Sequence, residues 1–387
     1  MRKSNSAQST NKFIHAFLGL VFATVLIFCS DCLFINNTAF ASPLKKQPIK
    51  ALYIPLADHY AALVAYERYR TQMKYADFQL EQMKNWDLLR AYFQSGEADM
   101  AFAMSPLAMD MYHENPHFRW IGLMHRDGNA LAINKILDKE IKLPERRQSR
   151  KPDKEVAAAL KHAFLKTKKS IQIGMPHILS THTVVLYHYL KEQGLRLGLS
   201  PSSETEIFAI AVPPAKSPTF IKRKNNRATP AAIEQSLPWV DIVETGGFGH
   251  IAWYSKDVLP SQYGHIECIT LATNQALSTK FRATKEVMQY IHLAGQDIEQ
   301  ARHEGGEKME VLVNIIQKHI KAHTRDAIIA SLNPKLNVIN YNHLNIDKPG
   351  LKLIMGLALN GGILKNAINI DTFADQRFVF TTSNNNQ

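Results

Sequence analysis

Short apolar runs alternate with segments of helical periodicity along the first third of the chain. Apolar runs at 49–55, 78–83, 99–104, 118–124 and 130–134 predict strands, and helical patterns at 59–69 and 86–95 separate the first three of them. Ser105 and Pro106 are residue types that commonly open a helix, so another helix should follow the third strand. This strand–helix rhythm predicts a doubly wound, mostly parallel sheet.

The rhythm restarts after a charged stretch at 135–169, which we interpret as a surface linker leading into a partly helical segment. Strands are predicted at 170–174, 206–212, 240–244 and 266–271, and helices at 180–192, 231–236, 278–321 and 348–359, the third of them broken at 305–306. Two successive α/β sections predict two lobes. Ligands of such sheets bind at the carboxyl ends of the strands, so we expect a cleft between the lobes.

The N-terminus has the pattern of a secretory signal. Three basic residues precede an apolar run at 13–28, and Ala39 to Ala41 forms a small-x-small cleavage site. We therefore expect residues 1–41 to be removed and the mature protein to work in the periplasm. The alternative is an uncleaved anchor, although the apolar run is shorter than the roughly 20 residues that a membrane span needs.

Charge and cysteine content narrow the picture further. The net charge is +12, but the cations are spread along the chain with acids between them, and we interpret the densest run, 222–227, as a solvated loop. Nucleic acid is not expected as the partner of an exported protein. Cys29 and Cys32 leave with the signal, so Cys268 remains alone, no intrachain disulfide can form, and the fold must rest on its core.

Polar residues gather at the turns that follow predicted strands. Ser, Thr and His side chains, together with backbone N–H groups at helix starts, suit a small oxyanion or an anionic organic molecule, and Trp adds a flat wall. Each residue also has an interpretation without a ligand: helix capping for the serines, core packing for the tryptophan and histidines, and a tight turn for the glycines. The candidate ligand-binding residues from this pattern are Asp58, His59, Trp86, Ser105, Ser180, Thr181, His182, Gly246 and Gly247.

Sixteen histidines raise the question of a metal site. Pairs such as His177 with His182 and His319 with His323 lack the Cys, Asp or Glu companions of a recognisable site. Nucleophile elbows, Walker loops and His-Glu-x-x-His motifs do not occur either. We therefore expect no metal, no cofactor and no enzymatic activity, and we keep a metal-binding receptor as an alternative.

Seven segments, taken in order along the chain, resemble one known family. They are Tyr53 to Asp58, Trp86 to Ala101, Ser105 to Ala108, His177 to Thr183, Val212 to Pro214, Leu271 to Asn274 and Asp371 to Phe378. In this order they are similar to the periplasmic solute-binding proteins of ABC importers in the nitrate, bicarbonate and sulfonate group. The resemblance covers nearly the whole mature chain.

The resemblance implies a two-lobed periplasmic binding protein fold of type II, in which each lobe is a mostly parallel sheet flanked by helices. Residues 48–135 and 272–380 would form the first lobe and 136–271 the second. It also implies a monomer that delivers a small anionic solute to an ABC permease in the inner membrane. Trp86 and His182 match ligand-contacting positions of nitrate binders, and Asn129 stands where those proteins use a Gln.

Departures from the family pattern leave the ligand open. The turn at 244–249 differs from the Gly-Glu-Pro-like turn of the group, and the segment at 215–229 looks like an insertion. The pyrimidine synthases of thiamine biosynthesis share this fold and provide an enzyme alternative. The export signal and the lone mature Cys268 argue against that alternative, because those enzymes are cytoplasmic and carry a Cys-rich motif.

Overall fold

The computed structural model describes residues 45–200 and 205–380, and the described residues from 46 onward belong to one compact unit. The expected signal at 1–41 and the polar tail at 381–387 lie outside the described residues. Within the described ranges, no helix has both the length and the apolar character required to cross a membrane.

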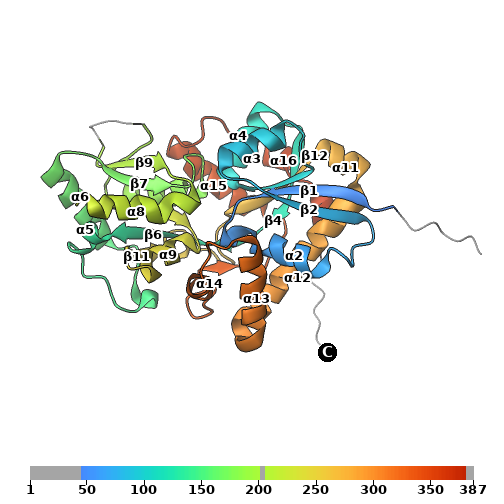
Figure 1. Ribbon diagram of the computed structural model, residues 1–387. Helices are drawn as coiled ribbons and strands as arrows, with labels where there is room; N and C mark the ends of the chain where they lie inside the picture. Colours follow the sequence, from blue (N-terminus) through green and yellow to red (C-terminus); the bar gives the residue numbers. More distant parts are fainter. Residues whose placement is uncertain (1–44, 201–204, 381–387) are drawn as a thin grey trace, which may run out of the picture. The chain divides into compact units, whose positions relative to one another are not determined.

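The first of the two large sheets has five strands in the order β2-β1-β3-β12-β4 (Figure 1). β1 pairs in parallel with β2 and β3, whereas β12 runs antiparallel to β3 and β4. Every residue of β3 is buried, as a central strand covered on both faces requires. The strands are β1 (Gln47–Tyr53), β2 (Ala76–Gln82), β3 (Met100–Met104), β4 (Phe118–Leu123) and β12 (Cys268–Thr273).

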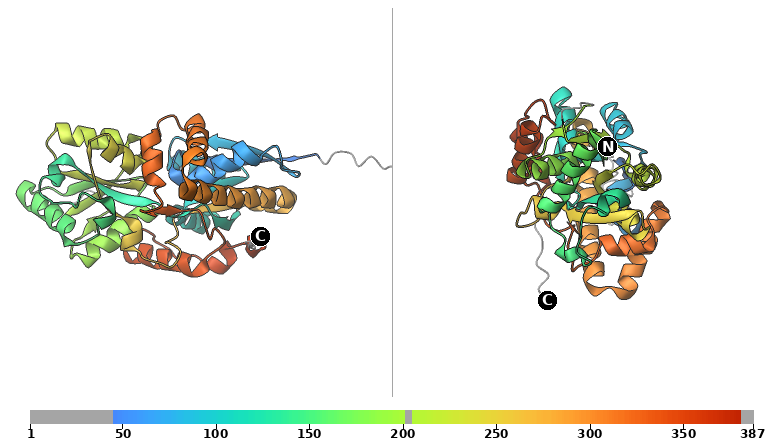
Figure 2. Two further views of the ribbon diagram at one scale, coloured as in Figure 1. Left: turned by 90° about the horizontal axis from the view of Figure 1, so that it is seen from below. Right: turned by 90° about the vertical axis from the view of Figure 1, so that its left-hand side faces the viewer.

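Helices cover this sheet, and the longest of them, α12, packs against α2, β1 and β2 (Figure 2). The break expected at 305–306 is confirmed: Gly305 separates α12 from α13 with a φ of 68°, a left-handed conformation that glycine adopts without steric cost. The helices on this side are η2 (Ala57–His59), α2 (Tyr60–Tyr69), α3 (Trp86–Gln94), α4 (Ser105–Glu114), α11 (Asn274–Thr279), α12 (Phe281–Glu304), α13 (Gly306–His319), α16 (Ile370–Phe373) and η5 (Gln376–Phe378).

The second large sheet has six strands in the order β11-β6-β10-β7-β9-β8. β10, β7, β9 and β8 are parallel neighbours, and β6 and β11 add an antiparallel edge. Two sheets that are largely parallel and flanked by helices confirm the expected fold class. The strands are β6 (Asn129–Asn134), β7 (Ile171–Met175), β8 (Leu197–Gly198), β9 (Ile207–Ala211), β10 (Ala231–Ser236) and β11 (Gly249–Tyr254).

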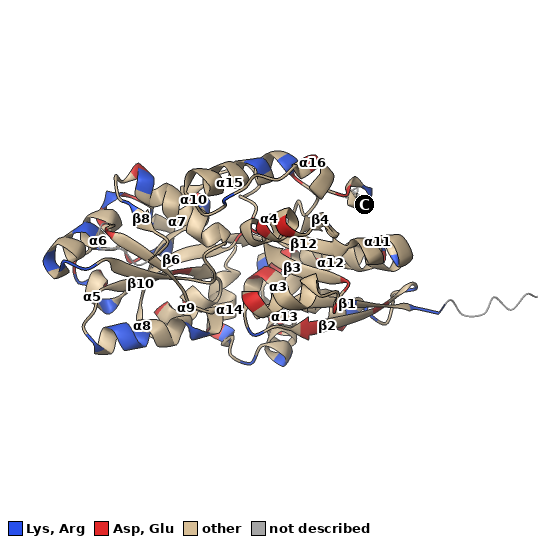
Figure 3. Cartoon of the chain, turned by 90° about the horizontal axis from the view of Figure 1, so that it is seen from above, with Lys and Arg blue, Asp and Glu red and all other residues tan. Residues whose placement is uncertain are grey.

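Helices also surround the second sheet, and a C-terminal helix, α15, contacts both α4 and α7. Lys and Arg are distributed over helices around both sheets, with Asp and Glu among them (Figure 3), in keeping with the spread of charge along the chain. The helices are α5 (Lys135–Asp138), η3 (Arg147–Ser149), α6 (Lys154–Thr167), α7 (Thr181–Glu192), η4 (Pro214–Lys216), α8 (Ser217–Asn226), α9 (Trp239–Thr245), α10 (Ser255–Val258), α14 (Arg325–Ser331) and α15 (Lys348–Asn360).

Two predicted elements have the opposite secondary structure. Residues 231–236, expected as a helix, form β10, and residues 240–244, expected as a strand, lie in α9. All six residues of β10 are buried, because the strand lies between β6 and β7. Ala, Glu and Gln in this run favour a helix by intrinsic propensity, but the central position in the sheet overrides that weak preference.

The basic run at 222–227 is also not a loop. Most of it belongs to α8, in which Ile221 is fully buried and the Lys222 ammonium lies 4.0 Å from the centre of the Phe248 ring. The helix packs on α9 and β10, so its apolar side belongs to the second sheet's core and its cations lie on the outer side.

Among the strands of the two large sheets, the chain passes from the first sheet to the second after β4 and returns before β12. β6 therefore belongs to the second sheet and β12 to the first, and the lobe boundaries expected at 135 and 271 stay a prediction. On the first of these passages, β5 (Arg126–Asp127) pairs with β13 (Ile339–Asn340). The division into two lobes itself stays a prediction.

Candidate functional site

Buried polar side chains meet where strands of both sheets end. Asp58 lies in η2, directly after β1, and Ser105 begins α4, directly after β3. From the second sheet, Thr181 and His182 begin α7 after β7, and Ser236 ends β10. All five side chains are fully buried. The carboxyl ends of these strands therefore supply the polar groups, as expected for open α/β sheets.

Side chains from the two sheets contact one another directly. Ser236 Oγ donates a hydrogen bond to Asp58 Oδ2 over 3.0 Å, and the hydroxyls of Ser105 and Thr181 are 3.3 Å apart. On the second sheet's side, His182 Nε2 lies 2.9 Å from Ser236 Oγ. The first two contacts therefore join the two sheets at the carboxyl ends of their strands.

Three further buried residues complete a compact cluster around Asp58. His125 follows β4, and Glu267 and Cys268 lie at the start of β12, so they flank the two passages between the sheets. His125 Nε2 lies 3.2 Å from Glu267 Oε2 and 3.6 Å from Asp58 Oδ2, and Cys268 Sγ lies 3.6 Å from Asp58 Oδ2. One potential metal-ligating atom from each of the four residues lies within 4.8 Å of the other three.

The cluster carries more acidic than basic groups. Burial raises the pKa of Asp58, but the positive charge of His125 outweighs this and lowers that pKa to about 2. Burial lowers the pKa of His125, yet the adjacent Asp58 and Glu267 raise it to about 10. The pKa of Glu267 is raised by burial and by the charge of Asp58, and the pKa of Glu234 is raised well above its usual value by burial and by both carboxylates.

The orientation of His182 leaves two acceptor atoms facing each other. The Ser236 hydroxyl has one hydrogen, which it gives to Asp58, so His182 Nε2 must be the donor toward Ser236 Oγ. His182 is neutral, because burial lowers its pKa to about 3. His182 Nδ1 is then an unprotonated nitrogen, 3.3 Å from Glu267 Oε1 and without a hydrogen bond to it. A proton on Glu267 or a bound cation would relieve this contact.

His59 and Trp86 form the wall of the site next to the cluster. His59 Nδ1 lies 2.8 Å from Ile54 O, and burial lowers the pKa of His59 to about 4, so the ring is neutral. The rings of His59 and Trp86 meet edge to face at 6.1 Å. Trp86 is 1% exposed, and its Nε1 has no partner among the described residues.

The remaining predicted residues have different positions. Ser180 caps α7 by accepting a hydrogen bond from Thr183 N, so the capping interpretation holds for it. Asn129 is the strand partner of Ser236, and both polar atoms of its buried amide lack a partner in the described structure. Gly246 and Gly247 follow α9, and the next strand residue, Gly249, pairs with Asn134 at the other end of β6 from Asn129. The structure therefore does not bring the two glycines to the cluster.

Sequence reasoning missed His125, Ser236 and Glu267, and it treated Cys268 only as a lone thiol. Ser236 was missed because its strand was expected to be a helix. The only sequence signal for the others is a polar residue within an apolar run, His125 after Leu123-Met124 and Glu267 after Ile266. Such positions require either a partner or a ligand when they are buried.

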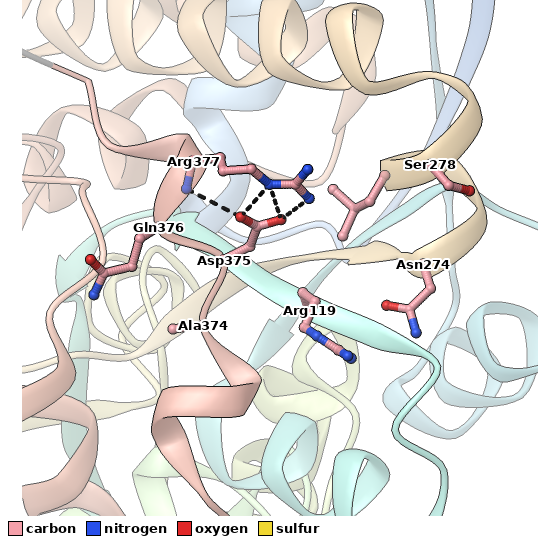
Figure 4. A pocket seen from close by; sticks show the side chains of 8 residues that line it. Arg119, Asn274, Ser278, Ala374, Asp375, Gln376 and Arg377 are labelled. Atoms are coloured by element: carbon pink, nitrogen blue, oxygen red, sulfur yellow. Dashed lines mark hydrogen bonds and ion pairs between the residues drawn. The ribbon is translucent and has the colours of Figure 1, made fainter.

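A hollow on the surface lies away from the buried cluster. It has a volume of about 540 Å³ and is lined by Arg119, Asn274, Ser278 and the ion pair of Asp375 with Arg377 (Figure 4). None of the predicted site residues lines this hollow. The carboxylate of Asp375 is already paired with Arg377, so we do not assign the ligand to this hollow.

Comparisons with known proteins point in one direction. The sequence profile of the NMT1-like family matches residues 42–312. No curated protein matches the chain by sequence.

Several solved structures have the same fold. The ligand-binding component of an ABC-type import system from Staphylococcus aureus, solved with zinc bound, is 21% identical with a TM-score of 0.65, and the match covers 86% of this chain and 98% of that one. The nitrate-binding protein NrtA from Synechocystis PCC 6803 is 17% identical with a TM-score of 0.70, covering 87% and 88%. The alkanesulfonate-binding protein SsuA from Xanthomonas axonopodis pv. citri, bound to MOPS, is 11% identical with a TM-score of 0.60, covering 84% and 97%.

Proposed function

Because the chain belongs to the NMT1-like family, we propose that it is the solute-binding subunit of an ABC importer, working in the periplasm and delivering its solute to a permease of the inner membrane. The observation that carries this proposal is the contact between the two sheets. Polar side chains from both meet at the carboxyl ends of their strands, Asp58 with Ser236 and Ser105 with Thr181. A receptor that closes on its solute needs donors and acceptors of this kind on both sides.

The burial of the cluster supports hinged access. Asp58, Glu267 and His182 are fully buried, so a solute can reach them only when the two sides separate. Closure then requires the solute to bind the closed state more tightly than the open state, by a few kcal/mol. The two passages between the sheets, next to His125 and Glu267, are where such a movement would occur.

The charges of the cluster bear on the class of solute. An anion, as the sequence predicts, would meet three acidic side chains: Asp58, and Glu234 and Glu267, in which burial raises the pKa and favours the neutral form. The one cationic side chain of the cluster, His125, is already paired with Asp58. No Lys or Arg of the described residues forms an ion pair with any of these carboxylates. This balance favours a cation or a neutral hydrogen-bonding solute over nitrate or a sulfonate.

The enzyme alternative, a relative of the thiamine pyrimidine synthases, has weaker support. The solved structures of similar fold named above are binding components of transport systems or solute-binding proteins. Absence of pyrimidine product after incubation of the protein with candidate precursors would count against an enzyme.

A ligand screen tests the proposal. The exported protein is purified, treated with chelator, and heated with nitrate, nitrite, bicarbonate, alkanesulfonates, pyrimidines and divalent metal ions. A solute at 100 times its dissociation constant should stabilise the protein by about 2.7 kcal/mol, and small-angle scattering should report a more compact chain when that solute is added. If no solute produces both effects, the receptor proposal is refuted.

A further inference from the structure

The strongest unassigned feature of the molecule is the donor set of the buried cluster. Asp58, His125, Glu267 and Cys268 offer carboxylate, imidazole, carboxylate and thiol groups, and all four side chains have no exposed surface. They come from three separate segments, η2, the chain after β4, and the start of β12. A core built only for stability has little reason to gather such groups.

Distances within the set match a four-coordinate ion. A tetrahedral zinc-type ion with bonds of about 2.0–2.3 Å holds its ligand atoms roughly 3.3–3.7 Å apart. The separations here are 3.2 Å from His125 Nε2 to Glu267 Oε2, 3.6 Å from His125 Nε2 to Asp58 Oδ2, and 3.6 Å from Cys268 Sγ to Asp58 Oδ2. Three of the six separations therefore lie at or near the tetrahedral range, and all six are within 4.8 Å.

Unpartnered buried atoms provide a second, independent indication of a ligand. Asp58 Oδ1, Glu267 Oε1 and His182 Nδ1 have no hydrogen-bond partner among the described residues, although all three side chains are fully buried. His182 Nδ1 and Glu267 Oε1 lie 3.3 Å apart without a hydrogen bond between them. Buried polar atoms without a partner call for a ligand, and carboxylate oxygens and imidazole nitrogens are atoms that a metal ion binds.

The space between the sheets favours an ion over an organic molecule. Ser236 contacts Asp58 at 3.0 Å, and Ser105 contacts Thr181 at 3.3 Å, on either side of the strand ends. An organic solute would have to separate these pairs. A single ion needs only the space among the ligand atoms of the four cluster residues.

We propose that the solute of this receptor is a divalent transition-metal ion of the zinc class, held by Asp58, His125, Glu267 and Cys268. This inference rests on the proposed function and names its solute. A thiolate and an imidazole select zinc, cobalt or copper over calcium and magnesium, which prefer oxygen ligands alone. Cys268 and His125 each lose a proton on coordination. From the second sheet, Ser236 donates a hydrogen bond to Asp58, and His182 lies beside Glu267. These outer contacts would let the bound ion hold both sides of the cleft together.

Metal titration of the chelator-treated, full-length exported protein tests this assignment. Zn²⁺ should bind at one ion per chain in calorimetry, and Co²⁺ should give the visible bands of a tetrahedral site together with an ultraviolet thiolate-to-cobalt band. Cys268→Ser should remove the ultraviolet band. Asp58→Asn and His125→Gln should each weaken Zn²⁺ binding ~10–100-fold or more. Binding that is unchanged in both of these variants overturns the assignment, as does the absence of one-to-one binding.

A matched control separates coordination from misfolding. His292→Gln changes a partly buried histidine, which packs against Phe380 away from the cluster, and should leave Zn²⁺ affinity unchanged. Circular dichroism should show the same folded spectrum for every variant used. If nitrate, a sulfonate or a pyrimidine stabilises and compacts the protein and Zn²⁺ does not, the metal assignment fails and the receptor proposal stands. If no solute does so, both fail.

Discussion

His182 is the side chain from α7 whose removal should most directly weaken closure of the cleft. Its ring lies between Ser236 on the second sheet and Glu267 at the start of β12, at 2.9 Å and 3.3 Å. We predict that His182→Ala weakens Zn²⁺ binding roughly fivefold, because Ser236 loses the donor that orients its hydroxyl toward Asp58 on the other sheet.

The magnitude follows from one hydrogen bond. A neutral hydrogen bond contributes about 0.5–1.5 kcal/mol net, which covers the bond from His182 to Ser236. We assign no stabilising energy to the approach of His182 Nδ1 to Glu267 Oε1, because these two atoms make no hydrogen bond. A loss of about 1 kcal/mol corresponds to roughly fivefold in dissociation constant, since 1.4 kcal/mol is a factor of ten.

Calorimetry with Zn²⁺ measures the affinity, and small-angle scattering at saturating Zn²⁺ measures compaction. His182→Gln keeps a donor that can reach Ser236 and should recover part of the loss. His188→Ala makes the same change at a partly exposed position of the same helix and should have no effect. An affinity for His182→Ala within twofold of the unmodified protein would refute the role of His182 in closure.

Three further predictions concern the surroundings of the site. Trp86→Ala should weaken Zn²⁺ binding by roughly tenfold or more in calorimetry, because His59 loses its edge-to-face support, and Trp86→Phe should restore most of the affinity. Arg147→Met should lower the free energy of unfolding in urea by about 3–5 kcal/mol, because it leaves the buried Asp241, 2.6 Å away, without its cation; a change below 1 kcal/mol contradicts this. Burial lowers the pKa of His292 to about 4, so the folded state takes up its proton less readily than the unfolded chain; stability should be full above pH 6.5 and fall as pH drops toward 4, by up to about 3 kcal/mol, and His292→Gln should remove that part of the acid dependence in thermal melts.

Local sequence patterns predicted the parts of the fold that local physics determines. Strand runs such as β1 and β3 are apolar and short, and Gly305 interrupts a long helical pattern at a left-handed position. The sequence pattern predicts a helix where β10 lies and a strand within α9, because the secondary structure of both segments depends on neighbouring strands. The residues 231–236 become a strand because they lie between β6 and β7, and that neighbourhood cannot be inferred from the six residues alone.

The same distinction explains which site residues were found. Asp58, Ser105 and His182 lie in turns directly after predicted strands, so the rule for open sheets identifies them. His125 and Glu267 lie on the chain passages between sheets, 142 residues apart, and no local spacing connects them. Spacing along the sequence therefore points only to pairs of nearby histidines and not to the buried cluster.

The inferred sign of the solute's charge depends on those missed residues. Serine, threonine and histidine at helix starts, counted alone, are donors and predict an anion. In the structure Ser236 gives its one hydrogen to Asp58, and Ser180 is engaged in capping α7, so few of these donors are free for a solute. Glu267, contributed by a distant segment, adds an acceptor opposite His182 that only a proton or a cation can satisfy. Because the charge balance of a buried site is set by all the groups that converge on it, the cation is the solute that leaves the fewest of them unsatisfied.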